Sequence, residues 1–287
     1  MKKFLSLIFL LVSFTTAYAQ SGLFDRVDDI NDFRSRVTKV VVFNDNSMID
    51  LFLKDAVLKN WEISPYEFCD QEEFAKIKTD TSYYFLIRVK GENKKDRSYG
   101  MDFITLLKGG PDAVKGINHM SEIVTLPLLP TGSSSDRIFS YLPSYVYIIQ
   151  SHVNKILTKK VNGFIGMLSY GSEMDNIDNL DDMQILFLKS DISYDISEKE
   201  LGSMFNGHAK YVTADEISKA LSEKRSNVLV SLTISPEKKM KKSYCYKMLI
   251  RATDGKLFFY RTHKINRRKG KGFLKEDMRR LSTPFSL

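Results

Sequence analysis

Apolar residues recur along the chain with two periods, and these periods predict its secondary structure. In the run 228–234 every second residue is Val, Leu or Ile, and the positions between them are Leu, Ser and Thr. This alternation is typical of a strand with one fully buried and one partly buried face. Between Ser47 and Asn60 the apolar residues follow helical spacing instead. The residues expected on the buried face of that helix are Ile49, Phe52, Leu53, Ala56 and Val57.

Three landmarks occur twice in the same order, which indicates an internal repeat. Asp70 with Glu73 and Thr213 with Glu216 each have the spacing of a capping box, which marks a helix start. Upstream of each box lies an apolar run, at 40–43 and at 185–188, and downstream lie the matching segments 98–101 and 243–246. We therefore predict two tandem copies of one unit.

Each predicted unit has the element order strand, helix, strand, helix, hairpin. The predicted strands are 40–43, 67–69, 83–89 and 99–107 in the first unit, and 185–188, 210–212, 228–234, 244–252 and 257–260 in the second. The first unit has only a glycine-rich stretch, 109–111, where the second has its last strand. The predicted fold class is α/β (α+β), with two pseudo-repeated units that each form a small mixed β-sheet with helices packed on one face.

Two further helices are expected in the first unit. Phe24, Val27, Ile30, Phe33 and Val37 recur at helical spacing near the N-terminus. A long helix over 137–159 closes the unit, and its Pro143 is expected to kink it. The segment 163–182 is rich in Gly, Asn and Asp, which favours a linker. The predicted units are therefore 20–160 and 183–287, joined by a linker over 161–182.

The first nineteen residues resemble a secretory signal peptide. Lys2 and Lys3 precede a short apolar run, and the small-residue ending Ala17-Tyr18-Ala19 predicts cleavage between Ala19 and Gln20. A membrane anchor that stays attached is the alternative, but a helix needs about 20 apolar residues to span a bilayer. We expect an exported protein, periplasmic or secreted, with no transmembrane segment after signal removal.

Positive charge is concentrated near the C-terminus. The chain has 43 basic and 35 acidic residues, a net charge of +8. Arg267, Arg268, Lys269 and Lys271 form the densest basic group and are the candidate anion-binding residues. Clustered cations attract anionic polymers. Possible partners outside the cytoplasm are an anionic glycan or a lipid head group, and the alternative interpretation is a solvated turn.

The sequence contains no pattern typical of a catalytic, cofactor or metal site. None of the four histidines has another His, Cys or acidic residue at a known motif spacing. A nucleophile elbow and a phosphate-binding loop are also missing. We therefore predict no catalytic, cofactor-binding or metal-binding residues. Cys69 and Cys245 either pair in the oxidising exported environment or remain two buried thiols.

The order of elements resembles that of the small α/β modules with which envelope proteins bind other proteins, among them the Tol-system propeller family. The resemblance concerns topology and not residues, so it implies no functional position. The leading hypothesis is an exported, non-enzymatic binding or assembly protein of a bacterial cell envelope with an envelope protein partner. The alternatives are a secreted hydrolase with a site between the two units and an anionic-polymer binder that uses the C-terminal basic cluster.

Overall fold

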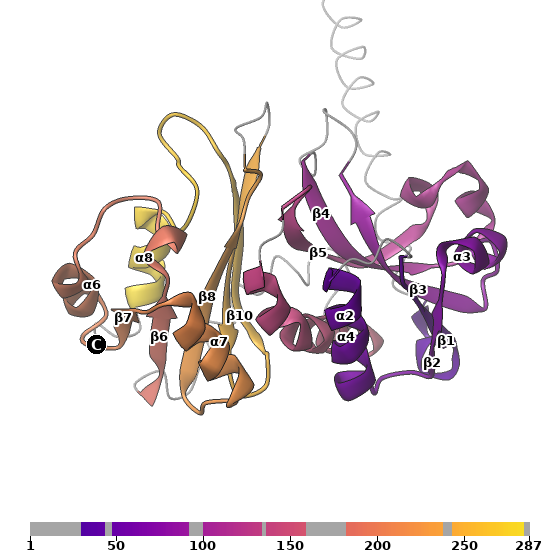
Figure 1. Cartoon of the computed structure of the whole chain (residues 1–287), viewed down its shortest axis with the longest axis horizontal. Helices are drawn as coiled ribbons and strands as arrows, with labels where there is room; N and C mark the ends of the chain where they lie inside the picture. Colours follow the sequence, from indigo (N-terminus) through magenta and orange to yellow (C-terminus); the bar gives the residue numbers. More distant parts are fainter. Residues whose placement is uncertain are drawn as a thin grey trace, which may run out of the picture.

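Two five-stranded mixed sheets form the architecture of the protein in a computed structural model (Figure 1). The structure describes residues 30–43, 48–91, 100–133, 136–158, 182–237 and 243–283. The predicted signal peptide, its cleavage site and nearly all of the predicted linker lie outside these residues. Among the helices that the structure describes, none combines the length and the apolar character needed to cross a membrane.

The first sheet has the strand order β2-β1-β3-β4-β5. β1 pairs in parallel with β2 and β3, and the β3-β4 and β4-β5 pairs are antiparallel. The elements of this unit are β1 (Val37–Val41), α2 (Met48–Asn60), β2 (Tyr66–Cys69), α3 (Gln71–Ile77), β3 (Tyr83–Lys90), β4 (Met101–Lys108), β5 (Ser121–Pro130) and α4 (Leu142–Leu157).

The second sheet has the strand order β7-β6-β8-β9-β10, with the same parallel and antiparallel pairs in the same places. Its unit consists of β6 (Gln184–Phe187), α6 (Glu198–Met204), β7 (Ala209–Tyr211), α7 (Ala214–Ser222), β8 (Val228–Ile234), β9 (Tyr244–Arg251), β10 (Leu257–Lys264) and α8 (Lys275–Ser282). The two units thus share an element order, whereas their origin as copies of one sequence remains a prediction.

Helices cover both faces of each sheet, and the expectation of helices on one face is wrong. The chain leaves β1 for β2 and then returns across β1 to β3, so two crossovers of the same hand lie on opposite faces. In the first unit α2 and α4 pack on one face and α3 on the other. In the second unit α7 packs on one face, and α6 and α8 on the other.

One core is shared by the two units. It contains residues of α2, α4 and the first sheet together with residues of α7 and the second sheet. Figure 1 shows the resulting layers, with α2 and α4 between the sheets, α3 outside the first sheet, and α6 and α8 outside the second. Smaller cores fill the space under the outer helices. Burial of apolar area in the shared core therefore joins the units.

Helix ends follow the sequence signals with one difference. The side chains of Asp70 and Thr213 accept from the backbone N–H three residues on, as predicted. Glu73 and Glu216 do not reach back, because they bind Lys39 and Arg225 instead. Ser197 and Glu200 form a complete capping box at the start of α6.

Several expected elements differ from the structure. The described part of the N-terminal helix is a short 3-10 turn, η3 (Phe33–Ser35), and Val37 already begins β1. The long closing helix is a 3-10 stretch, η6 (Asp136–Tyr141), followed by α4, where Pro143 lies in the first turn. In the first turn the missing N–H of proline removes no helical hydrogen bond, so Pro143 is compatible with the helix start and does not kink α4.

The first unit also has a fifth strand, β5, that the sequence analysis missed. Its sequence contains Pro127 and Pro130, which argue against a strand because proline cannot donate to a strand ladder. β5 lies at the edge of its sheet, and its pairing with β4 skips a residue beside Pro127. Proline is tolerated at such edge and bulge positions.

Candidate functional site

Arg137 of η6 joins the two units through Asp191, which follows β6. Its two terminal nitrogens donate to the two carboxylate oxygens of Asp191 at 2.8 and 2.6 Å. The same arginine and the Tyr141 hydroxyl both donate to the Ser231 carbonyl on β8. The Asp191 carboxylate is buried and also accepts from the hydroxyls of Ser231 and Thr233. Such a bidentate pair fixes orientation as well as supplying energy.

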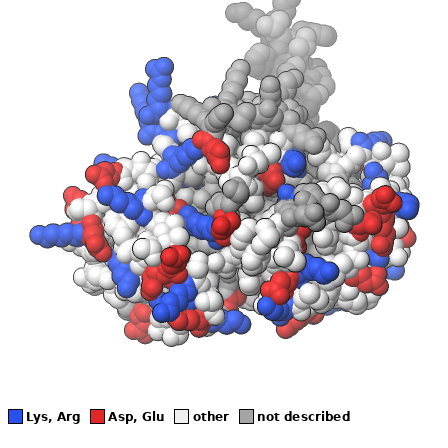
Figure 2. Space-filling view, viewed as in Figure 1, with Lys and Arg blue, Asp and Glu red and all other residues white. Residues whose placement is uncertain are grey.

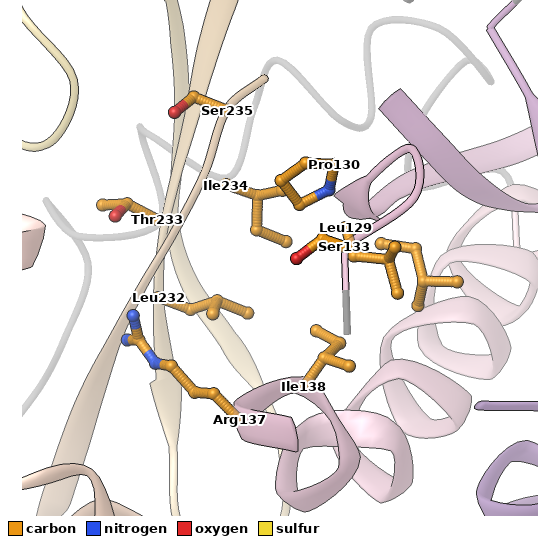
Figure 3. A pocket seen from close by; sticks show the side chains of 10 residues that line it. Leu129, Pro130, Ser133, Arg137, Ile138, Leu232, Thr233, Ile234 and Ser235 are labelled. Carbon is orange, nitrogen blue, oxygen red and sulfur yellow. The ribbon is translucent and has the colours of Figure 1, made fainter. Parts of the chain in front are cut away.

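A half-open pocket of about 220 Å³ lies beside this pair, between β5 and β8 (Figure 3). Its walls are mainly apolar, and its polar groups are three hydroxyls and the side chain of Arg137. Figure 3 shows Arg137 extending along one side toward Thr233. The lining residues are Leu128, Leu129, Pro130, Ser133, Arg137, Ile138, Leu232, Thr233, Ile234 and Ser235.

This pocket is where the hydrolase alternative would require its acid and base groups. No His, Asp, Glu or Cys is among the described residues that line it. Arg137 is already neutralised by Asp191. The arrangement therefore holds the units together and offers an apolar hollow, without acid–base groups at its surface.

The predicted anion-binding residues lie on the segment between β10 and α8, which we call the basic loop (residues 265–274). Backbone bonds tie its far end to the junction, because the Phe273 N–H donates to the Asp191 carbonyl at 2.6 Å. In its middle the His263 side chain donates to the Gly270 carbonyl at 2.7 Å. Asn266 accepts from the N–H groups of Arg268 and Lys269. The loop is therefore a fixed structure at the end of the second sheet.

The four basic residues of this loop have two different roles. Lys269 forms an ion pair with Glu276 at 2.9 Å, and Lys271 donates to the Glu237 carbonyl at 2.7 Å. Arg267 and Arg268 are exposed and form no ion pair with any carboxylate in the described ranges. Figure 2 shows Lys and Arg side chains projecting at the upper left, where Figure 1 places the loop. Both arginines are therefore exposed and unpaired as far as the described part of the chain shows.

A buried ion pair lies below the basic loop. Lys247 of β9 binds Asp277 of α8, and both side chains are 1% exposed. Asp277 also binds Arg261 at 3.2 Å and accepts from the Leu274 N–H, which begins α8. Burial lowers the pKa of Lys247, and the neighbouring Asp277 only partly offsets this effect. This pair positions α8 and so the end of the loop.

The two cysteines are free and buried, one in each sheet. Burial raises the pKa of both thiols to about 11, so they are protonated at neutral pH. Of the histidines, His119 is exposed, whereas His152 and His263 are buried. In the described part of the chain, no group of three or more His, Cys, Asp or Glu is placed to hold a metal ion.

Sequence reasoning placed the basic loop but missed the junction. Arg137 and Asp191 are 54 residues apart and belong to different units, so no local spacing signals their contact. Comparisons with known proteins add no functional assignment, because no family model, curated protein or solved structure matches the chain.

Proposed function

We propose that the protein is an exported, non-catalytic binding protein of a bacterial cell envelope, and that it binds anionic polymers through Arg267 and Arg268. The observation that carries the proposal is the position of these two side chains. Both are exposed on an internally bonded loop, and neither has an ion-pair partner among the residues that the structure describes. The export component rests on the N-terminal sequence.

The geometry favours a polymer over a small anion. A small anion needs a concave site with several converging donors. Arg267 and Arg268 are instead exposed on a loop, so each would contact a different anionic group of an extended ligand. Neighbouring contacts of this kind release counterions from a polymer, and the affinity then falls steeply with salt.

The choice of arginine supports the same ligand chemistry. Guanidinium is planar and donates in a fork that fits carboxylate, phosphate and sulfate groups. The two lysines of the loop are occupied by Glu276 and by the Glu237 carbonyl. Because these lysines hold the loop in shape, the loop backbone loses little further entropy when the arginines bind a ligand.

The test compares two variants of equal net charge. Arg267→Ala with Arg268→Ala removes the proposed contacts, and Lys199→Ala with Lys210→Ala removes two exposed lysines of α6 and β7. Binding to heparin and to polygalacturonate is measured between 50 and 300 mM salt, with anionic lipid vesicles as a third probe. We expect the arginine pair to lower polymer affinity about tenfold and to reduce the salt slope by about 1 to 2. The lysine pair should change affinity less than twofold.

Equal losses in both variants would show a bulk charge effect and would contradict the proposal. Binding of the native protein to vesicles alone would assign the arginines to lipid head groups and exclude the polymer. Absence of binding to all three probes at 50 mM salt would refute an anionic ligand for the loop.

A further inference from the structure

A half-open hollow of about 330 Å³ lies between α6 and α8, on the outer side of the second unit. Figure 1 shows these two helices outside the second sheet, on the side away from the first unit. The apolar surface of the hollow comes from Tyr194, Ile196 and Met204, and its other lining side chains are charged. The hollow is separate from the basic loop, because no residue of that loop lines it.

The charges that line the hollow are separated by sign. Lys275 and Arg279 are four residues apart on α8, so they lie on one side of that helix. Asp195 precedes α6, and Glu200 lies in the first turn of α6. We call the first two residues the basic wall and the other two the acidic wall. The hollow therefore presents opposite charges on its two sides.

No ion pair joins the two walls in the described part of the chain. Asp195 pairs with Lys189 at 3.4 Å, but these side chains are 91% and 71% exposed, so this pair is weak. Glu200 accepts from the N–H and the hydroxyl of Ser197, both through its Oε2 atom. These bonds lower the pKa of Glu200, so its carboxylate is charged at neutral pH. The two cations of the basic wall have no carboxylate partner among the described residues.

Backbone and buried contacts hold the two walls in place. The N–H and the hydroxyl of Ser193 donate to the Phe273 carbonyl at 2.9 and 2.8 Å, which ties the acidic wall to the start of α8. On the buried side of α8, Asp277 binds Lys247. The hollow is therefore formed before a ligand arrives, and binding carries little cost for ordering the backbone.

Tyr194 lies close to both walls. The Lys275 ammonium is 5.2 Å from the centre of the Tyr194 ring. Burial raises the pKa of Tyr194, and the nearby Arg279 and Glu200 shift it in opposite directions. The Tyr194 hydroxyl is buried and forms no hydrogen bond with any described residue. Buried hydroxyls are normally hydrogen-bonded, so a ligand that brings an acceptor to this hydroxyl would be stabilised.

We propose that the hollow binds a zwitterion of amino-acid chemistry, either a free amino acid or a short peptide, with an apolar side chain. Its carboxylate binds the basic wall, its ammonium binds the acidic wall, and its side chain packs against Ile196 and Met204. A simple anion or a simple cation would be attracted by one wall and repelled by the other. Because the four charged side chains are exposed, we expect a dissociation constant on the order of 100 μM. This inference does not depend on the ligand of the basic loop.

Isothermal titration calorimetry of the full chain tests the proposal with four probes. L-Leucine and leucyl-leucine carry both charges, whereas leucinamide lacks the carboxylate and N-acetyl-leucine lacks the ammonium. We expect at least one zwitterion to bind about tenfold more tightly than either capped probe. Tighter binding of leucine would assign the hollow to free amino acids, and tighter binding of leucyl-leucine would assign it to peptide ends. Equal affinity for a zwitterion and a capped probe overturns the proposal, as does the absence of zwitterion binding at about 10 mM.

Substitutions on each wall locate the binding site. Arg279→Gln removes a cation from the basic wall and should weaken zwitterion binding about tenfold. Glu200→Gln keeps the capping box, because glutamine accepts the same N–H bond, but it removes a charge and should weaken binding about fivefold. Arg268→Gln is the matched control, because Arg268 is exposed outside the hollow. It should change zwitterion affinity less than twofold.

The same variants separate this proposal from the proposed function. Arg268→Gln should weaken the binding of anionic polymers and not of the zwitterion, whereas Arg279→Gln should do the reverse. Thermal unfolding followed by circular dichroism checks that each variant keeps the native fold, since all the substituted side chains face solvent. Equal losses of zwitterion affinity in Arg268→Gln and Arg279→Gln would place the ligand elsewhere and overturn the proposal.

Discussion

The two units have the same element order but bury opposite faces of their sheets in the shared core. The first unit turns its α2 face inward and leaves α3 outside, whereas the second turns its α7 face inward and leaves α6 outside. Topology therefore determines which face of its own sheet each helix covers. It does not determine which of those faces meets the other unit.

The pattern of apolar residues on each helix explains the difference. α7 is apolar on one side only, and Ile217, Ala220 and Leu221 of that side are in the shared core. α2 is apolar on two sides, so after one side packs in the core the other still faces solvent. The comparison teaches that units of equal topology can differ in how much surface they leave for partners.

Replacement of Arg137 should have the largest effect on how the two units hold together. Arg137→Met leaves the Asp191 carboxylate buried with hydroxyl donors and no cation. We expect the free energy of unfolding to fall by about 3 kcal/mol or more, measured by urea denaturation. Arg261→Met is the control, because its partner Asp277 keeps Lys247. Equal losses in both variants would contradict a special role for the junction.

The buried lysines of the two sheets differ in the exposure of their partners. Lys247→Met removes one side of a pair that is 1% exposed on both sides, and we expect a loss of about 2 kcal/mol. Lys39→Met removes contacts to Glu67 and Glu73, which are 59% and 43% exposed and can hydrate, so the loss should stay below about 1 kcal/mol. Chemical denaturation of both variants measures the difference, and a reversed order would disprove this explanation.

A histidine of α4 should make the shared core sensitive to acid. Burial and the nearby Lys155 lower the pKa of His152 to about 4, and a backbone contact with Ile123 only partly offsets this effect. The unfolded chain binds a proton at this histidine near pH 6.5, whereas the folded chain does not. Above pH 6.5 the histidine therefore costs no stability, and between pH 6.5 and 4 it lowers the free energy of unfolding as the pH falls. When the pH is lowered from 7 to 5.5, this histidine should reduce the free energy of unfolding by about 1 kcal/mol.

His152→Gln keeps a neutral polar side chain and should remove that part of the pH dependence. Urea unfolding at both pH values gives the comparison. An unchanged pH dependence in the variant would show that His152 is not the sensitive group.

Most strands could be predicted because their signal is local. The run 228–234 matches β8 at both ends, and the starts of the second helices follow from Asp70 and Thr213. β5 could not be predicted, because its tolerance for Pro127 depends on a position at the sheet edge. Phe52 was assigned to the buried face of its helix but lies on the exposed side, since only the packed structure shows how far the core extends around α2.

The candidate site divides in the same way. The sequence located the basic loop, since clustered charge is visible without a fold. It did not show that Lys269 and Lys271 have partners, whereas Arg267 and Arg268 have no ion-pair partner among the described residues. The reason is that Glu276 and Glu237 reach the loop from other elements.

What the sequence alone determined is local: the periods of its strands and helices, the start signals of its helices and the basic run near its end. Only the tertiary structure decided which sheet faces meet, which charges are paired and which apolar helix face stays exposed. The physical reason is that apolar burial and ion pairing depend on contacts between residues far apart in the chain, such as Arg137 and Asp191. Local spacing carries no information about such contacts.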